Sequence, residues 1–342
     1  MRSLRVYFQP YFVKNLFPGI NSMLKIKCAV IGAGYLGRFH AQKYKMLESV
    51  DFIGVCDINP QMAENLADEL NVPAYFNVQE LLERVDAVSI AATTKSHYAL
   101  ARTCLEHGIH VLVEKPMTET VDQARELVAL AHQHGVKLQV GHLERFNSAR
   151  LALEPYLTEP VFIESSRLAP YNPRGADVNV ILDLMIHDID IIQNLVNSPI
   201  KTIDAHGVPV LTQAIDIANA RITFENQCVA NITASRVSFK TERKTRIFQP
   251  NNYISIDYQE KQFAIFEKSD RELFPGVADI NRYQSSLEKG DALFEEIKAF
   301  VQCIINDTPP PVSGEAGLSA LQTATIITER INAHLSRRYA TI

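Results

Sequence analysis

Tryptophan is absent from this sequence of 342 residues, cysteine occurs only five times, and no apolar run is long enough to cross a bilayer. A membrane-spanning helix needs about 20 consecutive apolar residues, so none is expected here. The cysteines are odd in number, widely spaced and never arranged as C-x-x-C, which excludes a disulfide framework, a zinc finger and a dithiol redox motif. They are Cys28, Cys56, Cys104, Cys228 and Cys303. Such cysteine usage is typical of the reducing cytoplasm, where we expect the protein to be located.

A large excess of charge of one sign is also missing. Lysine and arginine total 34, aspartate and glutamate total 39, and the formal net charge is −5. So weak a field does not attract a polyanion, and neither nucleic acid nor a membrane surface is an expected partner. With 46% hydrophobic residues, the chain has the composition of a globular protein of two domains. A small molecule is therefore the expected partner.

The first 24 residues are the least regular part of the sequence. They mix basic residues, prolines and aromatics, and they lack the apolar stretch and cleavage site of a signal peptide. We interpret residues 1–24 as an N-terminal extension. Two origins stay open: translation starts naturally at Met23, or the extension is genuine and packs on the surface.

Short apolar runs alternate with helical patterns between residues 25 and 143. Buried strands are expected at residues 26–31, 52–55, 87–90, 109–113 and 137–140. Helices are expected at residues 35–47, 60–70, 96–107 and 120–134. Alternation of this kind predicts a doubly wound α/β domain of the Rossmann type, with a parallel sheet and crossover helices, over residues 25–143.

After residue 143 the pattern becomes that of an antiparallel sheet. Apolar and polar residues alternate over 218–225 and again over 228–234, with a short turn between them, which predicts a hairpin with one apolar face. Further strands are expected at 253–258 and 262–266, and two helices at 287–305 and 317–336. We therefore predict a second domain, residues 144–342, of the α+β class with a largely antiparallel open sheet.

A glycine-rich motif follows the first predicted strand and opens the first predicted helix. Its sequence is Gly-Ala-Gly-Tyr-Leu-Gly at residues 32–37, a G-x-G-x-x-G pattern. Such glycines let the backbone approach a pyrophosphate, whose charge the helix N-terminus stabilises. Asp57 ends the second predicted strand, where a carboxylate can accept from a ribose 2′-hydroxyl and would repel the 2′-phosphate of NADP. The pattern predicts an NAD site, the alternative being a glycine-rich packing turn. The expected cofactor-binding residues are Gly32, Gly34, Tyr35, Leu36, Gly37 and Asp57.

Polar residues follow the next two predicted strands. Thr93, Thr94 and His97 stand beyond the strand at 87–90, at the edge where open α/β sheets bind ligands, although helix capping explains them equally well. The sequence Glu-Lys-Pro follows the next strand at residues 114–116. A lysine held there by a proline points into the same crevice, although a solvated turn would use lysine too. To the cofactor site we add Thr93, Thr94, His97, Glu114 and Lys115.

Residues 180–196 are apolar almost all round and therefore predict a buried helix. Asp183, His187 and Asp190 interrupt this helix at spacings that place them on one face. Because buried charge is costly unless it is paired, these groups either satisfy one another structurally or face an active-site cavity. A metal site lacks a recognisable ligand set, and we predict none. The unspecified candidates for extra metal ligands are His142 and Glu144.

The predicted hairpin is followed by a run of basic residues. The run consists of Arg236, Lys240, Arg243, Lys244 and Arg246. Charge runs usually form solvated faces, but a substrate that carries a diphosphate would find natural partners in such a cluster. On this hypothesis the substrate-binding residues include Arg167, Arg174, Arg236 and Lys240.

In their order along the chain, these motifs resemble the Gfo/Idh/MocA family of oxidoreductases. The resemblance rests on the glycine motif, on the polar residues at 93–97, on Glu-Lys-Pro at 114–116 and on Asp183-x-x-x-His187. It covers the chain from residue 25 to the C-terminus. Two stretches, Gly-His-Leu-Glu-Arg-Phe-Asn at 141–147 and Asp-Leu-Met-Ile-His-Asp-Ile-Asp at 183–190, are similar to the branch of UDP-N-acetylglucosamine 3-dehydrogenases, which supply precursors for the amino sugars of lipid A.

The resemblance implies tightly held NAD, an open sheet that mediates homodimers or homotetramers, and an active site between the two domains. Lys115, Asp183 and His187 would surround the reacting carbinol, with the peptide before the proline in the cis form. His187 would take the hydroxyl proton, oriented by Asp183, and Lys115 would stabilise the developing oxyanion, although the two roles could be exchanged. To substrate binding the resemblance adds Arg145 and Asn147.

These expectations describe an NAD-dependent enzyme that oxidises a hydroxyl of a sugar nucleotide, at carbon 3 of UDP-N-acetylglucosamine. A polyol, inositol or simple-sugar dehydrogenase of the same family is the nearest alternative, because a neutral substrate would not need the basic run. A non-catalytic, NAD-sensing regulatory protein is the alternative of another class. The stripe of ionisable groups in a buried helix argues against it.

Overall fold

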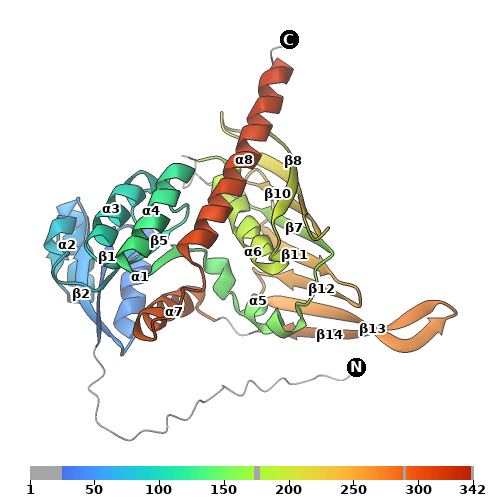
Figure 1. The fold of residues 1–342 in the computed structure, drawn as a ribbon, viewed down its shortest axis with the longest axis horizontal. Helices are drawn as coiled ribbons and strands as arrows, with labels where there is room; N and C mark the ends of the chain where they lie inside the picture. Colours follow the sequence, from blue (N-terminus) through green and yellow to red (C-terminus); the bar gives the residue numbers. More distant parts are fainter. Residues whose placement is uncertain (1–24, 173–177, 288–289, 340–342) are drawn as a thin grey trace, which may run out of the picture.

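The computed structural model describes residues 25–172, 178–287 and 290–339. The N-terminal extension and Arg174 therefore lie outside the described residues. Two sheets form the body of the molecule, and the long helix α8 (Gly314–Tyr339) runs between them (Figure 1).

The first sheet is parallel and has six strands in the order β3-β2-β1-β4-β5-β6. Its strands are β1 (Ile26–Ile31), β2 (Val50–Cys56), β3 (Ala74–Tyr75), β4 (Ala87–Ile90), β5 (His110–Glu114) and β6 (Leu138–Gly141). Its crossover helices are α1 (Tyr35–Met46), α2 (Pro60–Leu70), α3 (Thr94–Glu106) and α4 (Val121–His134). The prediction of a doubly wound domain is confirmed, and only the short edge strand β3 was not expected. The strand order reverses between β1 and β4, where such sheets bind ligands.

Local sequence explains where these helices begin and end. Asn59 caps α2 by accepting hydrogen bonds from the main-chain N–H groups of Gln61 and Met62, and Pro60 occupies the first turn, where its missing N–H has no consequence. Gly135 ends α4 with a φ of 65°, a left-handed conformation that glycine adopts without strain. The start of α2 and the end of α4 are thus set by their own cap residues.

The second sheet has eight strands in the order β14-β13-β12-β11-β7-β10-β9-β8, and only β7 and β10 are parallel neighbours. Its strands are β7 (Phe162–Leu168), β8 (Ile200–Val208), β9 (Ile217–Phe224), β10 (Val229–Ser235), β11 (Glu242–Phe248), β12 (Asn252–Asp257), β13 (Gln262–Phe274) and β14 (Val277–Ser286). The largely antiparallel open sheet is therefore confirmed, including the hairpin of β9 and β10. Strands β7, β8, β11 and β14 had not been expected.

Helices cover one face of this second sheet, and the buried core lies beneath them. The predicted helix at 180–196 begins with a π-helical turn, Ile181–Met185, and continues as α6 (Ile186–Val196). π-helical turns often occur at functional sites. Helix α8 contributes Ile327 and Ile331 to this core and Leu321 to the core of the first sheet, so it joins the two halves.

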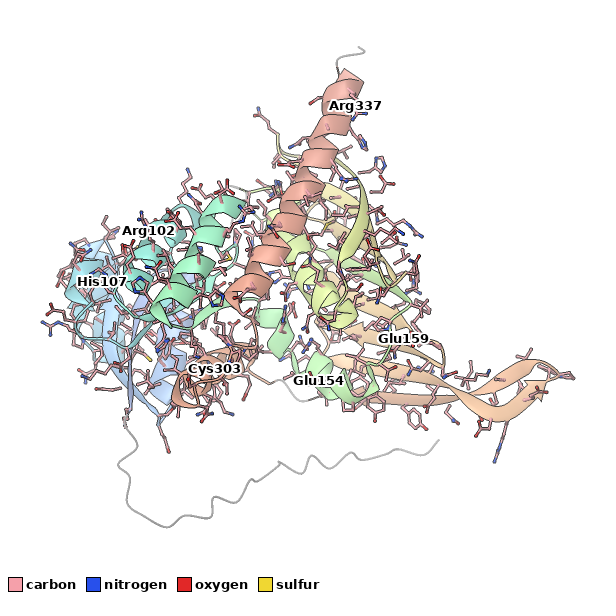
Figure 2. All side chains as sticks on the ribbon, in the orientation of Figure 1. Arg102, His107, Glu154, Glu159, Cys303 and Arg337 are labelled. Atoms are coloured by element: carbon pink, nitrogen blue, oxygen red, sulfur yellow. The ribbon has the colours of Figure 1, made fainter. Side chains whose placement is uncertain are left out.

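The last part of the chain returns to the first sheet. Helix α7 (Ala292–Ile305) packs against α1 and buries Ile297 and Phe300 with the side chains of β1. Figure 2 labels Cys303 on α7 and Arg337 near the far end of α8. The boundary at residue 143 stays a prediction, but α7 belongs spatially with the first sheet.

Candidate active site

The glycine motif forms the turn between β1 and α1, and its three glycines have different surroundings. A Cβ on Gly32, whose φ is 103°, would lie 2.6 Å from the main-chain oxygen of Ala91. A Cβ on Gly37 would lie 1.7 Å from the main-chain oxygen of Gly32. Gly34 has no atom within 4 Å of its Cβ position and stands at the N-terminus of α1. Gly32 and Gly37 are thus required for packing, whereas Gly34 leaves the space that a pyrophosphate needs.

Asp57 lies at the carboxyl end of β2, directly over this turn. Its carboxylate accepts hydrogen bonds from Ala33 N at 2.7 Å and Asn59 N at 2.8 Å. These bonds fix the carboxylate beside the turn and leave it lone pairs for a ribose hydroxyl. An open cleft of about 320 Å³ adjoins the turn between α1 and α2, and Tyr35 is one of the exposed side chains that line it. Leu36 is exposed as well. The turn, the carboxylate and the cleft fit a bound dinucleotide.

The polar residues after β4 have structural roles in this geometry. Thr93 is the residue before α3, its hydroxyl lies 3.3 Å from that of Ser96, and Thr94 begins the helix. His97 is buried, and its ring nitrogens lie 2.9 Å from the oxygen of Pro116 and 3.1 Å from that of Ala92. His97 thus ties the loop after β4 to the Lys-Pro turn and acts on a cofactor only through that turn.

Glu114, at the end of β5, turns into the protein. Its carboxylate lies 3.0 Å from Nε2 of His40 on α1 and accepts from the main-chain N–H of Lys115 at 3.2 Å. Burial raises the pKa of Glu114, but the hydrogen bond with His40 and the nearby positive charges outweigh burial and lower it overall. The carboxylate therefore holds the start of the Lys-Pro turn, whose Lys115–Pro116 peptide is cis, as the family resemblance implies.

The Lys-Pro turn brings Lys115 to the π-helical turn of the second half. Lys115 Nζ donates to the main-chain oxygen of Asp183 at 2.7 Å and lies 3.6 Å from its carboxylate. Both side chains are partly exposed, 20% for Lys115 and 25% for Asp183. The expectation that Asp183 orients His187 differs from this geometry, because the carboxylate of Asp183 faces Lys115.

His187 lies one turn further along and is partly buried. Its Nδ1 atom has no hydrogen-bond partner among the described residues, and its ring is edge-on to that of His142, with centroids 6.2 Å apart. Burial, and then the positive charges of Lys115 and Arg167, hold the pKa of His187 well below the ordinary value for histidine. Burial also lowers the pKa of His142. Both imidazoles are therefore neutral at pH 7, and His187 is able to accept a proton.

Two arginines expected to bind substrate are instead buried in ion pairs with α6. Arg145 donates to both carboxylate oxygens of Asp190, at 2.6 and 2.7 Å. Arg167 donates to Asp188 at 2.7 Å and to Glu144 at 3.0 Å. Internal carboxylates thus occupy both guanidinium groups, and the side chains of Arg145 and Arg167 are only 9% and 3% exposed. The pairs fix α6, and hence His187, against the neighbouring segments.

The other predicted substrate residues are dispersed. Arg236 is buried and donates to Asp216 at 2.8 Å, which ties β10 to the loop before β9. Asn147 caps α5 (Ser148–Leu153) by accepting from Ala149 N. Lys240 is 70% exposed and pairs with Glu242. The structure thus gathers Lys115, Asp183 and His187 and leaves the proposed diphosphate partners apart.

Sequence reasoning missed several residues of this region. Asp188 lies between His187 and Asp190 and anchors α6, although it is outside the expected stripe. Glu144 was considered only as a metal ligand, yet it accepts from Arg167 and lies 3.5 Å from Arg243. Within the described part of the chain, no three His, Cys, Asp or Glu side chains are grouped to hold a metal ion. The sequence could have indicated the role of Asp188, because a carboxylate in an otherwise apolar helix predicts a buried cation as its partner.

Comparisons with known proteins agree with this geometry. The model of the oxidoreductase family with an NAD-binding Rossmann fold matches residues 26–142, and that of the GFO/IDH/MocA C-terminal domain matches residues 159–252. UDP-N-acetylglucosamine 3-dehydrogenase of Acidithiobacillus ferrooxidans is 36% identical over 316 residues, which cover 92% of this chain and 100% of that relative. A solved structure of that enzyme has a TM-score of 0.84 and 36% identity, covering 91% of this chain and 99% of the other.

A more distant relative points to a different substrate. Myo-inositol 2-dehydrogenase of Thermotoga maritima is 24% identical over 317 residues, which cover 86% of this chain and 93% of that relative. None of the helices in the described ranges is long and apolar enough to span a membrane. The extent of these matches shows that the chain belongs to the Gfo/Idh/MocA family of NAD-binding oxidoreductases.

Proposed function

We propose that this protein oxidises the carbon-3 hydroxyl of UDP-N-acetylglucosamine to the 3-keto sugar in the cytoplasm. The observation that carries the chemistry is the convergence of Lys115, from the first half of the chain, with Asp183 and the neutral His187 from the second. The substrate comes from the similarity to the Acidithiobacillus enzyme. Oxidation of UDP-N-acetylglucosamine at carbon 3 also fits a role in supplying amino-sugar precursors of lipid A.

The chemistry divides between the cofactor and the chain. When bound, NAD would be held by the glycine turn and Asp57 and would supply the acceptor for the hydride that leaves the oxidised carbon. His187 takes the proton of the hydroxyl, because its imidazole is neutral and its Nδ1 atom has no hydrogen-bond partner in the described ranges. The ammonium group of Lys115 stabilises negative charge on the same oxygen, and Asp183 holds that ammonium in place.

Activity assays with substrates of different classes test this proposal. The purified protein, with its NAD content measured, is given UDP-N-acetylglucosamine, UDP-glucose, free N-acetylglucosamine and myo-inositol, and both reduced cofactor and product mass are followed. Loss of two hydrogen atoms from UDP-N-acetylglucosamine alone supports the proposal. Turnover of inositol or a free sugar assigns the protein to the polyol dehydrogenases, and no turnover despite bound NAD supports the regulatory alternative.

Substitutions test the roles of the individual residues. Lys115→Met and His187→Gln should each lower kcat by about 100- to 10,000-fold, the usual contribution of a general acid or base, while NAD stays bound. Lys298→Met is the matched control, because Lys298 lies on the surface of α7 and is 48% exposed. Normal turnover by NAD-loaded Lys115→Met or His187→Gln would refute the assigned roles.

The polyol alternative has one structural observation in its favour. Arg167 and Arg236 were expected to bind a diphosphate and Arg145 to bind the substrate, and each is buried against an internal carboxylate. A neutral polyol needs no cation in its site. The distinction between the two substrates therefore depends on whether another cation faces the site.

We also propose that a second copy of this chain packs against the outer face of the second sheet. The hairpin of β13 and β14 extends beyond the body (Figure 1) and exposes Leu273, Phe274 and Ile280. Exposed apolar side chains on a projecting hairpin favour contact with a partner. The molar mass in solution tests this: a dimer or tetramer is expected, and Phe274→Asp should lower the mass if the hairpin takes part.

A further inference from the structure

The basic run that follows β10 is divided between the two faces of the second sheet. On β11, Arg243 stands directly opposite Arg167 of β7, while Lys244 stands opposite Ser166. Directly opposite residues share a face, and successive residues of a strand alternate. Arg167 is buried under α6, so Arg243 lies on the inner face with His187, whereas Lys244 lies on the outer face. Arg246, two residues beyond Lys244, also lies on the outer face, where it pairs with Glu164.

The pairing of Arg243 with Arg167 places two cations opposite each other, and the carboxylate of Glu144, 3.0 Å from Arg167 and 3.5 Å from Arg243, offsets part of their repulsion. Like charges directly opposite each other on neighbouring antiparallel strands destabilise the pair. Lys244, by contrast, stands opposite Asp257, and its Nζ lies 3.4 Å from that carboxylate. A residue that breaks a local rule for stability is a candidate for a functional role. Arg243 is such a residue, and Lys244 is not.

Arg243 also differs from the buried arginines in what surrounds it. Its side chain is 48% exposed, and its guanidinium lies 3.5 Å from Oε1 of Glu144, an oxygen that already accepts from Arg167 at 3.0 Å. A guanidinium has five N–H donors, so a single shared oxygen leaves most of them for a ligand. Glu144 holds the guanidinium group of Arg243 in position but leaves the side chain partly exposed. The negative charge of Glu144 also weakens the attraction of Arg243 for an anion.

Arg167 connects Arg243 to the segment that carries His187, because it shares Glu144 with Arg243 and pairs with Asp188, the next residue after His187. Arg243 is one of the positive charges that lower the pKa of His187, after burial, Lys115, Arg167 and His142. Its charge therefore reaches the imidazole across the site. In a sugar nucleotide the diphosphate is attached at carbon 1, on the same ring as the carbon-3 hydroxyl. In a substrate whose hydroxyl meets His187, the diphosphate is therefore separated from that hydroxyl only by the width of the sugar ring.

We propose that Arg243 binds the diphosphate of the substrate and is the residue by which this site selects a nucleotide sugar over a neutral polyol. The proposal rests on the proposed function and adds the group that recognises the substrate class. Arg243 contacts the substrate at a distance from the reacting carbon. It therefore contributes mainly to substrate binding and little to the chemical step.

The test compares Arg243→Gln with Lys244→Gln in the full-length, NAD-loaded protein. The two residues are adjacent on β11, similarly exposed at 48% and 50%, and similarly distant from a carboxylate, but they lie on opposite faces. The affinity for UDP is measured by calorimetry, and KM and kcat are measured for UDP-N-acetylglucosamine. Hydrogen bonds to charged groups contribute about 1.5 to 3 kcal/mol, or about 10- to 100-fold.

We expect Arg243→Gln to weaken UDP binding and to raise KM by about 10- to 100-fold, with kcat changed less than about threefold. Arg243→Lys should restore part of the affinity, because it returns the charge without the planar fork. Lys244→Gln should stay within about twofold of the unsubstituted protein in every quantity. The molar mass of Lys244→Gln in solution is measured as well, because Lys244 lies on the outer face, which is the proposed contact between copies of the chain.

Other outcomes overturn the proposal in distinguishable ways. If the unsubstituted protein oxidises UDP-N-acetylglucosamine but Arg243→Gln binds UDP normally, the role of Arg243 is wrong and the proposed function stands. A loss of kcat without a change in KM assigns Arg243 to the chemical step and also overturns the proposal. If the unsubstituted protein neither binds UDP nor oxidises the nucleotide sugar, the proposed function and the role of Arg243 both fail.

Discussion

The ammonium nitrogen of Lys115 lies 2.7 Å from the main-chain oxygen of Asp183 and 3.6 Å from its carboxylate. The hydrogen bond to the main-chain oxygen fixes the position of the ammonium group, and the carboxylate supplies a negative charge beside it. The main-chain contact is independent of the side chain at position 183, so the two effects are separable by substitution. It also joins the Lys-Pro turn of the first sheet to the π-helical turn that precedes α6.

Asp183→Asn should therefore preserve the fold and NAD binding while lowering kcat by about 10- to 100-fold, the effect of removing a charged partner. Steady-state kinetics and the NAD content of the purified variant check this. Asp204→Asn is the control, because Asp204 lies on β8 and is 71% exposed. Unchanged turnover by Asp183→Asn would show that the main-chain contact alone orients Lys115.

The convergence of Lys115, Asp183 and His187, the proposed reacting residues, could be predicted from the family resemblance, because each belongs to a motif beside a recognisable element. The burial of the arginines in internal ion pairs could not be predicted from the sequence. Arg145 meets Asp190 from 45 residues away, and such pairs depend on how segments distant in the sequence pack against each other. Arg243 was recognised as part of the basic run, but the face of the sheet on which it lies could not be predicted, for another reason. In the sequence Glu-Arg-Lys-Thr-Arg-Ile-Phe of β11 the polar residues at 242–244 conceal the alternation, so the strand and its two faces went unnoticed.

The glycine turn offers a substitution that separates packing from cofactor binding. Gly37→Ala places a Cβ 1.7 Å from the main-chain oxygen of Gly32 and should lower the free energy of unfolding by about 3 kcal/mol or more. Gly34→Ala meets no atom within 4 Å, and the φ of −75° at that position is one that alanine adopts without strain. The melting temperature of NAD-free Gly34→Ala should therefore stay near that of the unsubstituted protein.

NAD titration supplies the second half of that comparison. Gly34→Ala should bind NAD at least about tenfold more weakly, because the new methyl group occupies the space left for the pyrophosphate. Normal NAD affinity in Gly34→Ala would place the pyrophosphate elsewhere. A stable Gly37→Ala protein would show that the turn relaxes more easily than its close contact indicates.

The two buried imidazoles make stability depend on pH. Burial lowers the pKa of His142 in the folded state, so below about pH 6.5 the unfolded chain binds a proton that the folded chain does not. The free energy of unfolding therefore falls as the pH decreases, by at most about 1.4 kcal/mol per pH unit for each such group. Replacing His142 by Gln should remove its share of this dependence.

Denaturant unfolding between pH 7.5 and pH 5 measures the difference between His142→Gln and the unsubstituted protein, which isolates this one group. The free energy of unfolding of the unsubstituted protein should exceed that of His142→Gln by less at pH 5 than at pH 7.5. His107→Gln, at an exposed position at the end of α3 (Figure 2), should follow the unsubstituted protein throughout. A constant difference for His142→Gln would mean that His142 titrates alike in both states.

Glu296 on α7 should have the opposite pH dependence. The residue is fully buried, and neither carboxylate oxygen has a hydrogen-bond partner among the residues described. Burial, and then the charges of Glu114 and Asp190, hold the pKa of Glu296 well above its ordinary value. The folded protein thus keeps a proton that the unfolded chain releases above about pH 4.3, so this group costs stability increasingly as the pH rises.

Glu296→Gln cannot ionise and should raise the free energy of unfolding by about 2 to 3 kcal/mol at pH 7, with little change near pH 4. Denaturant unfolding at both pH values checks this, with Glu295→Gln as the control, since the neighbouring side chain on α7 is 48% exposed. A loss of stability of equal size at both pH values would show instead that the protonated carboxyl makes a hydrogen bond that the amide cannot replace. Glu296→Gln leaves Lys115 and His187 unchanged. A change in kcat would therefore indicate that the proton on Glu296 affects the site through the charge of Glu114, whose carboxylate accepts from the main-chain N–H of Lys115.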